Sequence, residues 1–129
     1  MTVDLDMNIL VVDDFFTMTM LVRNLLRSLG FKNVDEARDG SSALEKIAER
    51  PYALVISDWN MKPMSGIDLL KTLRAQGNDV PFIMVTAENT TANVLEAKAA
   101  GVSGYITKPF NAQTLRKRIS GVFGPFEEP

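Results

Sequence analysis

Five polar side chains stand at the ends of short apolar segments in this chain. They are Asp13 and Asp14 after residues 8–12, Asp58 after 53–57, Thr86 at the end of 81–86, and Lys108 after 104–107. Short apolar runs bounded by turn residues are typical of buried strands. If these strands are parallel, their carboxyl ends share one edge of a sheet, where open α/β sheets bind ligands. The spacing therefore predicts that three carboxylates, a hydroxyl and an ammonium group lie together.

Three carboxylates held this close repel one another, at about 4 kcal/mol for each pair 4 Å apart in a medium of dielectric constant near 20. Protons or cations must relieve this repulsion. Ligands that are all oxygen favour Mg²⁺ over Zn²⁺, and Mg²⁺ accepts one or two carboxylates together with a phosphate. Lys108 supplies a mobile point charge for a phosphate oxygen, and Thr86 supplies a hydroxyl donor. We therefore interpret Asp58 as a phosphate acceptor beside a magnesium site.

Each of these residues also has an ordinary structural explanation when it is taken alone. An acidic pair after a strand is usually a solvated loop, and Lys-Pro before a helix is usually a turn. Trp59 and the nearby Met61 and Met64 are typical packing residues. The joint pattern is more specific, because every polar residue follows a different predicted strand.

The elements that must position these residues alternate between strand and helix. The expected strands are residues 8–12, 33–37, 53–57, 81–86 and 104–107. A helix with one apolar face runs from Met18 to Leu29 and ends at Gly30. The next four helices are expected to begin at Ser42, Ser65, Thr90 and Asn111. Ser42 follows an Asp39-Gly40 turn and forms a capping pattern with Glu45, and Ser65 forms one with Asp68.

Apolar strands that do not alternate in polarity favour a parallel sheet covered by helices on both faces. The fold class is therefore α/β and doubly wound, with five strands and five helices. We expect one domain over residues 1–129, with a loose leader at 1–6, a short tail at 124–129 and no output domain.

Composition excludes several classes of protein. The chain has 129 residues, 46% of them hydrophobic, and a formal net charge of −2, which argues against a nucleic-acid-binding face. It has no cysteine for a disulfide framework or thiolate chemistry, and no histidine to act as a base or metal ligand. No apolar run reaches membrane-span length, and the acidic N-terminus is unlike a signal peptide. We expect a cytoplasmic protein.

Several motifs together resemble the receiver domains of response regulators, and among these the stand-alone receivers of chemotaxis. The similarity covers roughly residues 7 to 123. The motifs that carry it are Val11-Val12-Asp13-Asp14, Val22-Arg23-Asn24-Leu25-Leu26, Leu29-Gly30-Phe31, Ser57-Asp58-Trp59-Asn60-Met61, Met84-Val85-Thr86-Ala87-Glu88, Gly104-Tyr105-Ile106 and Lys108-Pro109-Phe110. The resemblance implies a flavodoxin-like sheet with strand order 2-1-3-4-5.

The resemblance also implies a role for each matching residue. Asp58 takes a phosphoryl group from a phosphohistidine on a partner kinase. Asp14, Asp58 and the backbone carbonyl of Asn60 hold Mg²⁺, and Asp13 acts mainly through metal-bound water. The phosphoryl group is bound by three further residues, which are Lys108, Thr86 and Ala87. The Lys108-Pro109 peptide bond is cis in this family.

The remaining implied roles concern signalling. Thr86 and Tyr105 form a switch that reshapes the face made by the fourth helix, the fifth strand and the fifth helix. Asn60 and Glu88 tune hydrolysis of the aspartyl phosphate, and this pair matches the short-lived chemotaxis type. The implied partners are a histidine kinase, a flagellar motor switch or other output protein, and a phosphatase. The protein is then a monomeric signalling phosphoacceptor that assists its own phosphorylation and dephosphorylation, and not an enzyme.

The chain departs from the family pattern at three places. Lys62 stands where the family usually has proline, and Pro63 follows it, so the loop on the metal side is expected to differ in shape. Phe15 and Phe16 make the mouth of the site more apolar. Thr90 and Thr91 replace lysines at the start of the fourth helix, which favours a different output partner.

Three other functions would make different demands on these residues. A phosphate sink would drain a shared kinase without contacting a motor, and the missing lysines favour it slightly. A Mg²⁺-dependent phosphohydrolase with an aspartyl nucleophile would carry Asp-x-Asp after the first strand, but this chain has Asp13-Asp14-Phe15. A flavin-binding module would need a hydroxyl-rich phosphate loop there, and two aspartates would repel the phosphate.

Overall fold

Five parallel strands form one sheet in a computed structural model that describes residues 2–87 and 89–126. The strand order is β2-β1-β3-β4-β5, as expected. The strands are β1 (Asn8–Val12), β2 (Asn33–Ala37), β3 (Leu54–Asp58), β4 (Phe82–Thr86) and β5 (Gly104–Thr107). Strand β3 is shifted by one residue from the expected 53–57, because Asp58 itself pairs in register with Val85 of β4.

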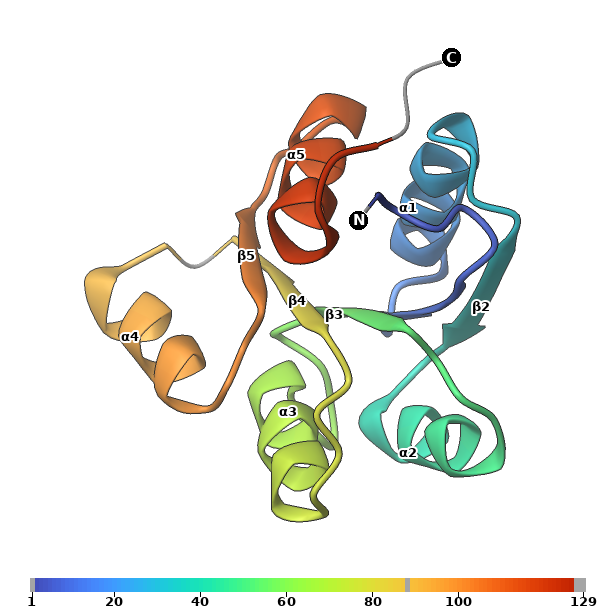
Figure 1. The fold of residues 1–129 in the computed structure, drawn as a ribbon. Coiled ribbons are helices and arrows are strands. Elements are labelled where there is room, and N and C mark those ends of the chain that lie inside the picture. Colours follow the sequence, from blue (N-terminus) through green and yellow to red (C-terminus); the bar gives the residue numbers. More distant parts are fainter. Residues whose placement is uncertain (1, 88, 127–129) are drawn as a thin grey trace.

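Helices cover both faces of this sheet, which confirms the doubly wound α/β prediction (Figure 1). The helices are α1 (Phe16–Ser28), α2 (Gly40–Glu49), α3 (Gly66–Ala75), α4 (Thr91–Ala99) and α5 (Ala112–Phe123). Helices α1 and α5 lie on one face, and α2, α3 and α4 lie on the other. None of the helices in the described part of the chain has the length and hydrophobicity that crossing a bilayer requires.

Helix starts follow the expected capping residues in three cases and differ in one. The side chains of Ser65, Thr90 and Asn111 accept hydrogen bonds from backbone N–H groups in the first turns of α3, α4 and α5. The predicted Ser42 cap is wrong, because the Asp39 carboxylate accepts the Ser42 N–H at 2.7 Å. Helix α2 therefore begins at Gly40, inside the expected Asp39-Gly40 turn.

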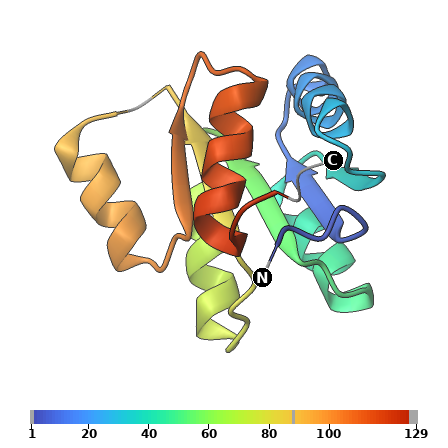
Figure 2. The ribbon, with the colours of Figure 1, turned by 45° about the horizontal axis from the view of Figure 1, so that its top comes forward.

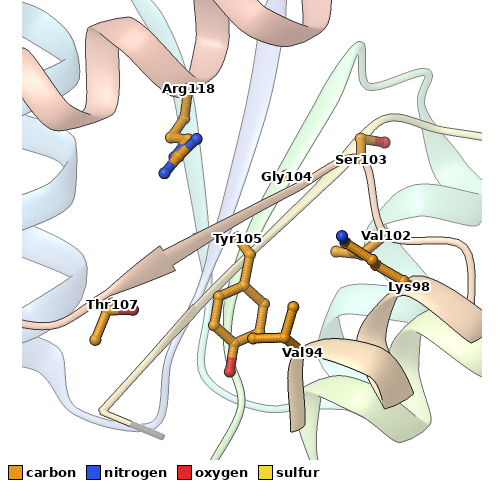
Figure 3. A pocket seen from close by; sticks show the side chains of 8 residues that line it. All are labelled: Val94, Lys98, Val102, Ser103, Gly104, Tyr105, Thr107 and Arg118. Atoms are coloured by element: carbon orange, nitrogen blue, oxygen red, sulfur yellow. The ribbon is translucent and has the colours of Figure 1, made fainter. Parts of the chain in front are cut away.

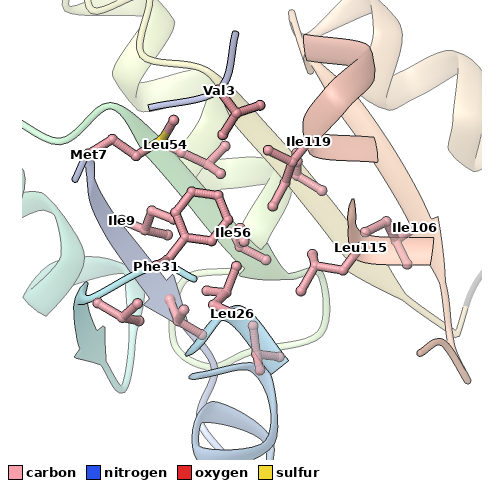
Figure 4. Close-up of a cluster of buried hydrophobic side chains, with 14 of the residues drawn as sticks. Val3, Met7, Ile9, Leu26, Phe31, Leu54, Ile56, Ile106, Leu115 and Ile119 are labelled. Carbon is pink, nitrogen blue, oxygen red and sulfur yellow. The ribbon is translucent and has the colours of Figure 1, made fainter. Parts of the chain in front are cut away.

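Two hydrophobic clusters fill the space between the sheet and its helices. The cluster under α1 and α5 contains Ile9, Leu26, Ile56 and Leu115 among its buried members (Figure 4). The opposite cluster lies under α2, α3 and α4. Alternate residues of the central strands β1, β3 and β4 belong to opposite clusters, so these strands are apolar on both faces.

Residues 2–6, the described part of the leader expected at residues 1–6, are not loose, because Val3 anchors them to the domain. Val3 is buried, and its N–H donates to the carbonyl of Pro125 at 2.9 Å. Figure 2 shows this segment beside the chain that leaves α5. Phe126 lies edge-on to Phe31, with ring centroids 5.9 Å apart. The two terminal segments thus close one end of the hydrophobic core.

Candidate functional site

The structure brings the three predicted carboxylates together at the carboxyl edge of the sheet. Each of Asp13, Asp14 and Asp58 offers an oxygen, and these oxygens all lie within 4.8 Å of one another. Asp13 and Asp14 follow β1, and Asp58 ends β3, the next strand in the sheet. The parallel topology therefore explains a cluster whose members are distant in the sequence.

Asp13 is the more constrained member of the acidic pair. Its N–H donates to the carbonyl of Ala37 at 3.1 Å, and its carboxylate accepts the Phe15 N–H at 2.9 Å. Asp13 is buried, whereas Asp14 is exposed. The pair therefore offers one enclosed carboxylate and one that faces solvent.

Lys108 supplies the positive charge of the site. Its Nζ lies 3.0 Å from Asp58 Oδ1 and 4.0 Å from Asp13 Oδ2. Its backbone N–H donates to the Thr86 carbonyl at 2.8 Å, which anchors the residue beside β4. The Lys108-Pro109 peptide bond is cis, as expected, and the Lys62-Pro63 bond is also cis.

The electrostatics show that the acidic cluster is crowded. Burial is the main cause that raises the pKa of Asp13 from 3.8 to about 6, and the charges of Asp58 and Asp14 raise it further. Burial likewise raises the pKa of Asp58, although the hydrogen bond and charge of Lys108 oppose that rise. One lysine therefore does not neutralise the cluster, and the donor set of three carboxylates suits a hard divalent cation such as Mg²⁺.

Gly66 is a site residue that the sequence reasoning missed. A Cβ on Gly66 would lie 2.1 Å from the carbonyl oxygen of Asp58, so only glycine fits there. The Gly66 N–H donates to the Trp59 carbonyl at 2.8 Å, while the Trp59 N–H donates to Val85 at 3.1 Å. The only signal in the sequence was a glycine directly after the Ser65 cap.

The remaining predicted residues lie around this cluster or apart from it. Thr86 is buried at the end of β4, and Ala87 and Asn60 are exposed. Glu88 falls outside the described residues. Tyr105 lies in β5 with its ring 6.4 Å from that of Trp59, in an edge-to-face arrangement.

Tyr105 lines a separate hollow of about 390 Å³ between α4, β5 and α5, and not the acidic cluster (Figure 3). Val94 and Lys98 of α4 border this hollow, and Arg118 of α5 borders its other side. Trp59 directly follows Asp58 and contacts Tyr105, so it joins the two regions. The predicted switch residue is thus placed between the acidic cluster and an open surface.

Comparisons with known proteins agree with this geometry. The response regulator receiver domain family matches residues 9–120. The chain is 48% identical over 120 residues to chemotaxis protein CheY-3 of Vibrio cholerae, covering 92% of each chain. It is 47% identical over 119 residues to chemotaxis protein CheY of Pseudomonas aeruginosa, covering 91% of this chain and 96% of that one.

Solved structures show the same fold. Chemotaxis protein CheY4 of Vibrio cholerae superposes with a TM-score of 0.85 at 34% identity, covering 92% of this chain and 99% of that one. The receiver domain of the Francisella response regulator 1452 superposes with a TM-score of 0.83 at 32% identity, covering 89% of this chain and 94% of that one.

Proposed function

This chain belongs to the response regulator receiver family as a CheY-type chemotaxis receiver, and from that premise we propose that Asp58 is its phosphoacceptor. The observation that carries the proposal is the 3.0 Å contact between Asp58 Oδ1 and Lys108 Nζ inside a cluster of three carboxylates.

Phosphoryl transfer depends mainly on positioning and on neutralising charge. An oxygen of Asp58 forms a bond to phosphorus while the bond from phosphorus to the donor histidine nitrogen breaks, and that nitrogen later takes up a proton. Lys108 first pairs with Asp58 and then with a phosphoryl oxygen. Thr86 and Ala87 provide the hydroxyl and backbone donors beside it.

Asp14, Asp58 and the carbonyl of Asn60 would hold Mg²⁺, with Asp13 acting through metal-bound water. The bound ion would offset the negative charge of the carboxylates and of the arriving phosphoryl group. The raised pKa of Asp13 supports this assignment, because burial and the neighbouring carboxylates disfavour its charged form and a bound cation, like a proton, would offset that charge. Asn60 and Glu88 would tune the later hydrolysis of the aspartyl phosphate.

The output surface is proposed to be the face of α4, β5 and α5 around Tyr105. Thr86 and Tyr105 would respond to the phosphoryl group, and the Trp59–Tyr105 contact supports a link between the site and this face. A histidine kinase would load Asp58, a flagellar motor switch or other output protein would read the face, and a phosphatase would be a further partner.

A phosphate sink is the alternative, and Thr90 and Thr91 at the start of α4 are the residues that favour it. Leu95, an exposed apolar residue of α4, favours an output protein instead. Cells lacking the gene, complemented with Leu95→Ala, should lose motor switching if the face binds an output protein. Normal switching with normal phosphorylation would favour the sink.

Intact-protein mass after treatment with acetyl phosphate and Mg²⁺ tests the central proposal. The unmodified protein should gain one phosphoryl group, and a chelator should prevent the gain. Asp58→Asn is the matched control and should gain nothing. Equal labelling of both proteins would place the phosphoryl group elsewhere and overturn the assignment of Asp58.

A further inference from the structure

The loop between β3 and α3 rests on helix α2, which supplies none of the carboxylates in the acidic cluster. Met64 of this loop lies against Gly40, the first residue of α2. A Cβ on Gly40 would lie 2.5 Å from Met64 Sδ and 2.7 Å from Met64 Cγ, which is closer than side chains approach one another. Met64 can therefore occupy this position only because residue 40 has no side chain.

The same loop is held tightly at its two ends. At its start, the Trp59 N–H donates to Val85, and at its end Gly66 lies against the Asp58 carbonyl and donates to the Trp59 carbonyl. Asn60 is exposed and lies between Trp59 and the buried Met61. The ends are held by β4 and α3, and between them the buried Met61 and the contact of Met64 with Gly40 hold the loop against the domain.

We propose that Gly40 and Met64 are positioning residues for the metal side of the acidic cluster. Neither supplies an oxygen to the acidic cluster, and both act through the loop that carries the Asn60 carbonyl. This inference rests on the proposed magnesium site. Supporting residues of this kind typically change metal affinity about 10–100-fold when they are altered.

Gly40→Ala is the direct test, and Gly121→Ala is its matched control. Both replace a helical glycine, and alanine is the better helix former, so neither change weakens its helix intrinsically. A Cβ on Gly121 would meet nothing within 4 Å, whereas one on Gly40 would collide with Met64. Mg²⁺ affinity is read from the fluorescence of Trp59, the single tryptophan, and from the rise in melting temperature on adding Mg²⁺.

Gly40→Ala should weaken Mg²⁺ binding about tenfold, while Gly121→Ala should bind like the unmodified protein. Met64→Ala introduces no collision and should also weaken binding, so it carries the test if Gly40→Ala does not fold. The double variant should bind no worse than the single variant with the lower affinity, because both changes disturb the same contact between residues 40 and 64.

Unchanged affinity in either folded single variant, or losses that multiply in the double variant, would overturn the inference. If the unmodified protein shows no response to Mg²⁺ in either measurement, the proposed magnesium site fails instead. The two failures are therefore distinguishable.

Discussion

Replacing Asp13 with asparagine should stabilise the metal-free protein near neutral pH. The pKa of Asp13 is 3.8 in an unperturbed chain and about 6 in the fold, mainly because the carboxylate is buried. The folded state thus holds this proton more tightly than the unfolded state does. Stability from protonated Asp13 is fully present below about pH 4 and is lost as the pH rises through about 6.

The size of the effect follows from the same two values. A rise from 3.8 to about 6 corresponds to about 3 kcal/mol in the free energy of unfolding, at 1.4 kcal/mol for each pH unit. The asparagine oxygen can still accept the Phe15 N–H, and its amide can donate to the neighbouring carboxylates. Asp13→Asn should therefore gain about 2–3 kcal/mol near pH 8 and little near pH 4.

Urea denaturation in the presence of a chelator, at about pH 4 and about pH 8, measures this difference. Asp14→Asn is the control, because Asp14 is exposed and water screens its charge, so its gain should be smaller. A stability of Asp13→Asn that falls with pH as steeply as that of the unmodified protein would refute the electrostatic account.

Four further changes test other parts of the structure. Asp58→Asn removes one of three crowded anions and should raise the metal-free melting temperature while abolishing phosphorylation; a lower melting temperature would contradict this. Lys108→Ala leaves the carboxylates without their nearby cation and should lower the metal-free free energy of unfolding by about 2–3 kcal/mol in urea titrations, more at pH 8 than at pH 4. Phe126→Ala removes the ring that packs on Phe31 and should cost about 2–3 kcal/mol by the same assay, whereas no loss would mean that the terminal segments are not held. Gly66→Ala should destabilise the domain strongly and abolish labelling by acetyl phosphate, since its Cβ would meet the Asp58 carbonyl; a stable, labelled variant would show that the loop can move aside.

The sheet and the gathering of Asp13, Asp14 and Asp58 were predictable from the sequence. Apolar runs without alternation occur where both faces of a strand are buried, and the polar residues stood at the ends of those runs. The exact end of β3 was not predictable, because a carboxylate is disfavoured in a strand, yet Asp58 pairs in register with Val85. Local patterns identify such strands well, but they do not show which residues at the end of a strand still pair with the neighbouring strand.

Two features that the sequence did not reveal depend on which partner a backbone N–H group takes. Val3 is buried because its N–H meets the Pro125 carbonyl at the far end of the chain, and no periodic pattern marks that contact. Helix α2 starts at Gly40 because the Asp39 carboxylate caps it, although Ser42 with Glu45 offered an equally regular capping pattern. The first partner is distant in the sequence, and the second is a local residue that competes with another regular capping pattern.

The crowding of the acidic cluster follows from how its residues are held. Three backbone hydrogen bonds tie the site to neighbouring strands: from Asp13 to Ala37, from Trp59 to Val85, and from Lys108 to Thr86. Each bond continues the hydrogen bonding of the sheet at or beyond a strand end, so the strand ends cannot move apart without breaking it. Relief must therefore come from a proton, from Lys108 or from an added cation. The parallel sheet thus creates the repulsion that a cation could relieve, and the proposed Mg²⁺ site and phosphoacceptor would share this edge.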